Sequence, residues 1–258
     1  MKLGIGSYKE LFLNNLDFCL KHLDVLELQD FVMPSNLENT SIIQDYKRIL
    51  ADFAGEITLH GPYINLVPTS LDYRVRAVAE LRYLQAVAIA GEIGASKMVV
   101  HSYYDQKSGY SGYDEAWLRD NLEFWSGFLK KIQCSGIAIM FENCHDQRPA
   151  TFARLISELN TPYFTSCLDV GHCHCLSAIK PEAWIAAIKG RYFHITDNDG
   201  IDDSHLVAGQ GSIDFENVSR ALAACQEIYL ISEAQADFEL QLNVLNRLKG
   251  MIVSSASR

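Results

Sequence analysis

Short apolar runs alternate with longer segments of mixed polarity from one end of the chain to the other. The short runs predict strands, and the longer segments have the length and spacing of helices. Their regular alternation predicts βα units and a parallel sheet. The predicted strands are Leu3–Ser7, Val25–Gln29, Ile57–His60, Lys97–His101, Ile137–Glu142, Tyr163–Leu168, Arg191–Thr196 and Ile228–Glu233. The predicted helices are Glu10–His22, Thr40–Phe53, Leu71–Ile93, Tyr113–Gln133, Ala150–Leu159, Pro181–Ile188, Asp214–Cys225 and Phe238–Val253.

The helix predicted over Leu71–Ile93 has the clearest apolar pattern. Charged residues occupy several of the positions between its apolar ones. We expect the apolar positions, which recur at three-residue steps, to form the buried face. They are Val75, Val78, Leu81, Leu84 and Val87.

Eight βα units close naturally into a barrel, so the predicted fold class is α/β with one (β/α)8 TIM barrel over residues 1–258. A single domain is expected because no Ser/Gly-rich linker or low-complexity tract divides the chain. An open, doubly wound sheet would require a phosphate-binding glycine turn after an early strand. The Gly4-Ile5-Gly6 segment lies inside the first predicted strand instead.

An acidic or histidine side chain ends six of these apolar runs. In a parallel barrel the carboxyl ends of the strands share one face, where active sites are built. The six residues are His60, His101, Glu142, Asp169, His194 and Glu233. Further candidates are His172, one helical turn or a tight loop after Asp169, and the pair Asp203 and His205. Because imidazoles and carboxylates hold zinc, manganese and magnesium, the sequence predicts a metalloenzyme.

Composition restricts the compartment and the partners. Seven cysteines without framework spacing indicate free thiols and a reducing, cytoplasmic environment. The first predicted strand begins almost at Met1, which leaves no room for a secretory signal. Lys or Arg interrupts every apolar stretch, so no membrane span is expected. The formal net charge of −10 disfavours attraction to nucleic acid.

The motifs at these strand ends resemble the xylose isomerase-like TIM-barrel superfamily. This group includes sugar isomerases and epimerases as well as endonuclease IV enzymes. The resemblance runs from His60 to Glu233, and the ordered motifs are specific for the superfamily rather than for one reaction. The segments are Leu59-His60-Gly61-Pro62-Tyr63, Val100-His101-Ser102, Phe141-Glu142-Asn143, Cys167-Leu168-Asp169-Val170-Gly171-His172, His194-Ile195-Thr196-Asp197-Asn198, Asp203-Ser204-His205-Leu206 and Gly209-Gln210-Gly211-Ser212-Ile213-Asp214.

The resemblance implies one to three divalent ions. In the isomerase and epimerase branch, a single manganese, zinc or magnesium ion is held at the positions of Glu142, Asp169, His194 and Glu233. In the endonuclease IV branch, those four hold one zinc of three. His60, His101 and a bridging Glu142 then hold the second, and His172, Asp203 and His205 hold the third. This sequence matches every position.

Other residues favour a sugar over DNA. Lys and Arg are absent from residues 23–46 and 192–219, although a DNA-binding enzyme needs cations around its site. Residues 197–203 are strongly acidic, and the family's His-Pro-Gly is replaced by His101-Ser102-Tyr103. Tagatose 3-epimerase-type enzymes commonly use an Arg after the metal-binding His to hold the substrate. None follows His194 before Arg220, which counts against an epimerase of that type and also against phosphate recognition. We therefore expect a sugar or keto-sugar without phosphate.

The expected activity is metal-dependent isomerisation or epimerisation through an enediolate. Glu142 and Glu233 would move the proton, His172 would orient a substrate oxygen, and Tyr63 would contact the substrate at the mouth. The alternatives are a trinuclear-zinc endonuclease acting on abasic DNA and a barrel that binds metal or sugar without catalysis. Related barrels often dimerise or tetramerise, so a homo-oligomer is also an expectation.

Our expectations are weaker for two further pairs of residues. Glu27 and Gln29 end the second strand, where they either contact a substrate or fill the barrel rim. Cys144 and His145 could suggest a nucleophile with its base. Adjacent residues on an extended segment point to opposite sides, so an incidental role is expected for this pair.

Overall fold

A computed structural model describes residues 1–105 and 111–256. Within these residues eight parallel strands form a barrel in chain order, closed by pairing of β1 with β8. Each strand lies within one residue of its predicted bounds, and the predicted TIM barrel is confirmed. The strands are β1 (Lys2–Ser7), β2 (Val25–Leu28), β3 (Glu56–His60), β4 (Lys97–His101), β5 (Ala138–Glu142), β6 (Phe164–Asp169), β7 (Tyr192–Ile195) and β8 (Tyr229–Ser232).

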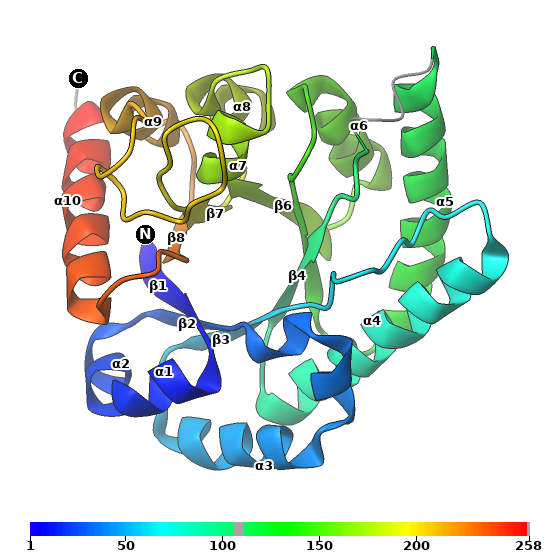
Figure 1. The fold of residues 1–258 in the computed structure, drawn as a ribbon, viewed down its shortest axis with the longest axis horizontal. Coiled ribbons are helices and arrows are strands. Elements are labelled where there is room, and N and C mark those ends of the chain that lie inside the picture. Colours follow the sequence, from blue (N-terminus) through cyan, green and yellow to red (C-terminus); the bar gives the residue numbers. More distant parts are fainter. Residues whose placement is uncertain (106–110, 257–258) are drawn as a thin grey trace.

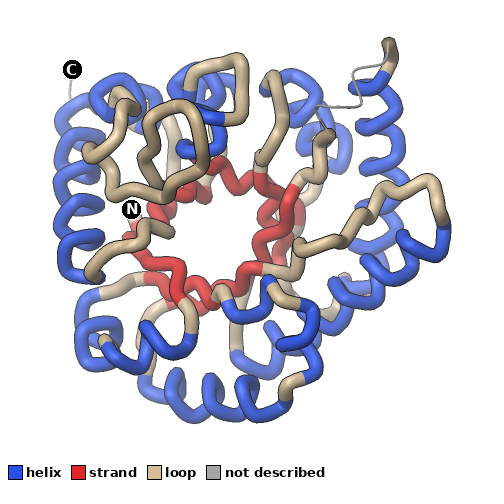
Figure 2. The backbone as a smooth tube through the Cα atoms, viewed as in Figure 1, coloured by secondary structure: helices blue, strands red, loops and turns tan. Residues whose placement is uncertain are grey.

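Helices surround the barrel and connect successive strands (Figure 1, Figure 2). The α-helices are α1 (Lys9–Asn14), α2 (Leu16–His22), α3 (Thr40–Ile49), α4 (Tyr73–Ile93), α5 (Tyr113–Ile132), α6 (Pro149–Leu159), α7 (Val170–Cys175), α8 (Pro181–Ile188), α9 (Phe215–Leu222) and α10 (Phe238–Ala256). The 3-10 helices are η1 (Asp30–Val32), η2 (Pro34–Glu38) and η3 (Leu50–Asp52). The predicted helix Glu10–His22 is two helices that meet at Asn15. No helix in the described part of the chain combines the length and apolar character that a bilayer crossing requires.

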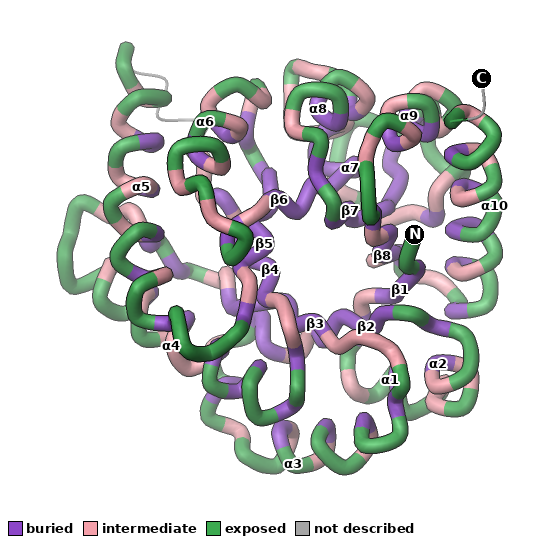
Figure 3. Tube along the Cα trace, turned by 180° about the vertical axis from the view of Figure 1, so that it is seen from behind, coloured by how far each residue is buried: buried purple, intermediate pink, exposed green. Residues whose placement is uncertain are grey.

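The helices pack on the strands through aromatic side chains. Trp125 of α5 is fully buried, with its ring 5.6 Å from that of Tyr83 and 5.3 Å from that of Phe164. Buried residues concentrate on the strands and on the inward sides of the helices (Figure 3). This packing holds α4, α5 and β6 together.

The predicted buried face of α4 is wrong at its first three positions, whereas Val87 is buried and Leu84 packs against the core. Val75, Val78 and Leu81 are 38%, 52% and 54% exposed. A helix has 3.6 residues per turn, so residues three apart recede by about 60° at each step and cannot share one face for long. The buried positions follow the helical spacing instead. They are Ala79, Tyr83, Ala86, Ala90 and Ile93, with Val87 and Ile89 beside them.

A cluster of charges closes the amino-terminal end of the barrel. Glu56 accepts hydrogen bonds from Lys2 (2.7 Å), Tyr229 (3.0 Å), Ser96 and Lys97. Burial opposes ionisation of Glu56, but the bonds from Lys2, Lys97 and Ser96 outweigh it and lower its pKa to about 2. The cluster ties β1, β3, β4 and β8 together at the end opposite the candidate site.

Candidate metal centre

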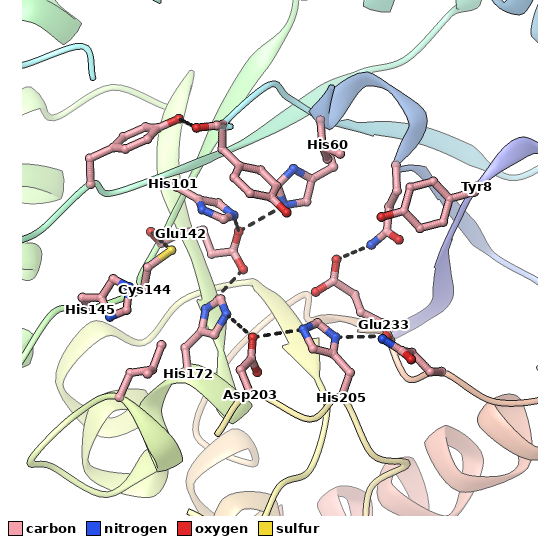
Figure 4. A pocket seen from close by; sticks show the side chains of 16 residues that line it. Tyr8, His60, His101, Glu142, Cys144, His145, His172, Asp203, His205 and Glu233 are labelled. Carbon is pink, nitrogen blue, oxygen red and sulfur yellow. Dashed lines mark hydrogen bonds and ion pairs between the residues drawn. The ribbon is translucent and has the colours of Figure 1, made fainter. Parts of the chain in front are cut away.

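The strand-end side chains predicted from the sequence lie around one cavity at the carboxyl end of the barrel (Figure 4). The cavity has a volume of about 660 Å³, and His60, His101, Glu142 and Glu233 line it. Strand register brings neighbours together, because His101 pairs with Glu142 and Asp169 pairs with His194. Asp169 and His194 are fully buried beside the lining residues.

One group of side chains surrounds the Nδ1 atom of His194. This atom lies 2.9 Å from Oε1 of Glu142, 3.0 Å from Oε2 of Glu233 and 3.8 Å from Oδ2 of Asp169. One nitrogen or oxygen atom of each residue lies within 4.8 Å of the others. Three carboxylates and one imidazole at this spacing are a donor set that suits a divalent cation.

A second group shares Glu142 with the first. Its Oε2 atom lies 3.3 Å from Nε2 of His60 and 3.3 Å from Nε2 of His101. The imidazole and carboxylate atoms of these three residues also lie within 4.8 Å of one another. Glu142 therefore presents one oxygen to each of two potential ion positions.

A third group is centred on Asp203. Its Oδ2 atom lies 3.1 Å from Nε2 of His172 and 3.1 Å from Nε2 of His205. Asp203 and His205 come from the long connection between β7 and α9, and His172 comes from α7. All nine residues proposed from the sequence thus lie in three adjoining groups.

The histidine rings are oriented by their second nitrogen atoms. In three histidines Nδ1 lies within 3.1 Å of a backbone carbonyl oxygen. The pairs are His60 with Gly61, His172 with Asn143, and His205 with Glu233. A proton donated there leaves Nε2 facing the carboxylates. His194 has the reverse arrangement, because its Nε2 lies 3.2 Å from Glu27 and its Nδ1 faces the first group.

Local structure fixes two of the acidic residues. Oδ1 of Asp169 accepts a hydrogen bond from the backbone of His172 (2.7 Å) and so caps α7. The cap places His172 beside the cavity and leaves Oδ2 of Asp169 facing the first group. Asp197 is fully buried and accepts backbone hydrogen bonds from Gly209, Gly211 and Ile213 (2.8–3.1 Å). These bonds fold back the connection that carries Asp203 and His205.

The electrostatics of the site favour added positive charge. A hydrogen bond to Asp203 raises the pKa of His205 to about 9. Burial opposes ionisation of Glu233, but the charge of His194 lowers its pKa to about 2. Protons on the imidazoles or metal cations can supply that charge. Buried oxygens of Glu142 (Oε2), Asp169 (Oδ2) and Asp203 (Oδ1) have no hydrogen-bond partner among the described residues, so the donor set suits cations.

Two residues given little weight in the sequence contact the site. Glu27 is fully buried and accepts hydrogen bonds from His194 and from the hydroxyl of Tyr192 (2.7 Å). Gln29 lines the cavity and donates a hydrogen bond to Glu233. A sequence signal existed for Glu27, because it is the acidic residue inside the apolar run Val25–Leu28.

The geometric argument that separated Cys144 from His145 is wrong. Both side chains line the cavity. The chain bends at these residues instead of extending β5, and the bend is held by Asp146, whose Oδ2 accepts a hydrogen bond from the backbone of Cys144 (3.0 Å). Adjacent residues can face the same side in a bend.

The wall of the cavity is aromatic and polar. Tyr63 lines it, with its ring stacked on His101 at 4.0 Å between ring centres. Among the described residues that line the cavity, none is Lys or Arg. The site can therefore gather cations, but within these residues it offers no fixed positive charge to a phosphate group.

Residues 21–242 match the family model described as xylose isomerase-like TIM barrel. A curated relative is the uncharacterized protein MJ1311 of Methanocaldococcus jannaschii. It is 25% identical over 241 residues, which cover 86% of this chain and 79% of that protein.

Solved structures share the fold. The TTHB071 protein from Thermus thermophilus, soaked with ZnCl2, has a TM-score of 0.81 and 24% identity, covering 97% of this chain and 98% of that chain. A D-tagatose 3-epimerase-like protein has a TM-score of 0.77 and 22% identity, covering 100% of this chain and 99% of that chain.

Proposed function

Because the chain belongs to the family of xylose isomerase-like TIM barrels, we propose that it is a divalent-metal-dependent isomerase or epimerase of a small, uncharged sugar or keto-sugar. The similarity to the solved D-tagatose 3-epimerase-like protein supports a reaction at a ketose. The zinc-soaked structure supports a role for a metal.

The placement of Glu142 and Glu233 carries the proposal. They come from β5 and from the residue after β8, and they face the cavity from opposite sides (Figure 4). An epimerase requires one carboxylate to remove a carbon-bound proton and a second group to return a proton on the other face. Burial opposes ionisation of both side chains, but neighbouring positive charge lowers both pKa values, from His194 and His101 at Glu142 and from His194 at Glu233. A bound divalent cation would supply the same charge, so both are ionised and able to act as bases.

Glu142, Asp169, His194 and Glu233 would hold the metal. A divalent cation there supplies positive charge that lowers the free energy of an enediolate formed when the proton leaves. His172, beside Glu142, would orient a substrate oxygen, and Tyr63 would contact the sugar ring at the mouth. The absence of Lys and Arg among the described lining residues favours a substrate without phosphate.

Proton exchange tests this assignment. The enzyme loaded with manganese or zinc is expected to incorporate deuterium from solvent into a ketose such as D-fructose or D-tagatose. Glu142→Gln should abolish that incorporation, and so should Glu233→Gln. Retained incorporation in either variant would remove that residue from the proton transfer.

A second candidate has its own supporting observation. The group of His60, His101 and Glu142 has the spacing of ligands for a second ion. Asp203 lies 3.1 Å from His172 and from His205, which could hold a third ion, as a trinuclear phosphodiesterase requires. Three zinc ions per chain, together with cleavage of abasic DNA, would favour this candidate. One ion per chain with ketose exchange would favour the epimerase. Tight metal binding without either activity would leave a binding barrel.

A further inference from the structure

A second cavity of about 560 Å³ adjoins the candidate metal centre. Both cavities are lined by Tyr8, Gln29, Glu233 and Gln235. The second one runs from this shared wall toward α1 and the start of α10. In Figure 4, Tyr8 lies on the far side of Glu233 from Glu142, which is the direction in which the second cavity continues.

Amide side chains dominate the polar lining of this second cavity. Asn15, Gln29, Gln235 and Gln241 all contribute to it. Gln241 is 2% exposed, and its Nε2 atom donates to the backbone carbonyl of Ala236 (2.7 Å). Its Oε1 atom is buried and has no hydrogen-bond partner among the described residues. Buried polar atoms are nearly always paired, so this oxygen lacks a partner on a side chain that lines the cavity. A ligand hydroxyl group can supply that partner when the Gln241 amide turns into the cavity.

The remaining lining excludes strongly charged anions. No Lys, Arg or His occurs among the described residues of the second cavity. The carboxylate of Asp237 accepts backbone hydrogen bonds from Glu239 (2.9 Å) and Leu240 (3.1 Å) at the start of α10. Tyr8 and Leu11, which are 47% and 51% exposed, provide apolar surface for ring carbons. Amides with apolar patches suit a neutral, hydroxyl-rich ring.

We infer that the second cavity is a subsite for the non-reacting ring of an uncharged, two-ring keto-sugar. This inference rests on the proposed function and narrows its substrate class to glycosides. The volume of the second cavity, about 560 Å³, supports this inference. Pockets of about 300–1,000 Å³ enclose ligands larger than one sugar ring, so the cavity has room for a ring of its own. A monosaccharide at the metal centre would leave the cavity beside Gln241 to water.

The test uses ligands that all contain fructose and differ in the group attached to it. D-Fructose has a single ring, isomaltulose carries a neutral glucosyl group on O6, maltulose carries one on O4, and D-fructose 6-phosphate carries an anion. Binding to the metal-loaded protein is measured by isothermal titration, and turnover is measured by deuterium exchange. At least one disaccharide should bind about tenfold more tightly than fructose, as one buried hydrogen bond and added apolar contact would give.

Two variants test the location of the subsite. Gln241→Leu removes the unpaired oxygen at similar volume, and Leu11→Trp fills the cavity from an exposed position. Each should remove the advantage of the disaccharide and leave fructose binding unchanged. Asn243→Leu, an exposed amide on the same helix, is the matched control and should keep the advantage. Thermal unfolding establishes that each variant is folded.

The outcomes separate the subsite from the reaction. Disaccharides that bind no better than fructose, or an advantage that survives both variants, would overturn the subsite even if fructose is turned over. Tight disaccharide binding that both variants abolish would support the subsite even if no ketose is turned over, and would then count against the proposed reaction. Tighter binding of the phosphate ester than of either disaccharide would overturn the assignment to neutral sugars.

Discussion

Nε2 of His194 lies 3.2 Å from both carboxylate oxygens of Glu27, on the ring edge opposite the Nδ1 atom that faces Glu142 and Glu233. Glu27 in turn accepts a hydrogen bond from Tyr192, whose hydroxyl group pairs with Thr58 (2.8 Å). This buried chain fixes the orientation of the imidazole before any ligand binds.

Glu27→Gln is expected to weaken metal binding about 10- to 100-fold, because the ring loses a charged acceptor while the space stays filled. Competition against a fluorescent chelator measures the affinity. Glu239→Gln, on the exposed first turn of α10, is the matched control and should bind metal like the parent. An unchanged affinity in Glu27→Gln would show that the ring orientation does not depend on this carboxylate.

Removal of metal should destabilise the fold. A ligand present at 100 times its dissociation constant stabilises the folded state by about 2.7 kcal/mol. For a chain of this size we expect chelation to lower Tm by about 5–10 °C. Differential scanning calorimetry with and without chelator measures the shift. Adding back zinc or manganese should restore it, and a Tm that is indifferent to metal would contradict the proposed ligand set.

Acid should weaken the amino-terminal end of the barrel through Glu56. Its pKa is about 2 in the folded protein, below the ordinary value of 4.5, so its contribution is full above about pH 4.5 and is lost as the pH falls toward 2. Glu56→Gln should lower the free energy of unfolding by about 2 kcal/mol at pH 7 and by much less near pH 2. Urea unfolding at a series of pH values measures this. An equal loss in the free energy of unfolding at pH 2 and at pH 7 would mean that Glu56 stabilises the fold by packing and not by its charge.

Asp197 should control the connection between β7 and α9. Asp197→Ala removes the buried acceptor of three backbone donors, one of them on the buried Ile213, and we expect a loss of about 3 kcal/mol in the free energy of unfolding. Hydrogen exchange should rise at the amides of Gly209, Gly211 and Ile213. Asp199→Ala, in the exposed part of the same connection, should change stability by less than about 0.5 kcal/mol. Equal effects of the two substitutions would contradict the role of Asp197.

The strands and their polar ends could be predicted because the relevant signals are local. An apolar run that ends in His60 or Glu142 is visible in a few residues, and the geometry of a parallel barrel then gathers such ends. The amino-terminal part of the buried face of α4 was mispredicted for an equally local reason. Three-residue spacing was treated as one face, whereas the burial of Ala79 and Tyr83 follows the true helical period.

The surroundings of the proposed ligands depend on distant parts of the chain and could not be predicted. Glu27 and His194 are 167 residues apart, and only closure of the barrel brings them together. The bend at Cys144 depends on Asp146, and the unpaired oxygen of Gln241 depends on how α10 begins. Such relationships follow from tertiary packing, which spacing in the sequence does not encode.

Glu142 gives one oxygen to the group around His194 and the other to His60 and His101. Because Glu142 belongs to both groups, it limits how the site can change between related barrels. Any replacement at position 142 disturbs both groups at once, so a change in the number of ions must begin elsewhere. Positions that serve one group, such as His101 or His205, are where a barrel of this kind could gain or lose an ion while the shared carboxylate stays in place.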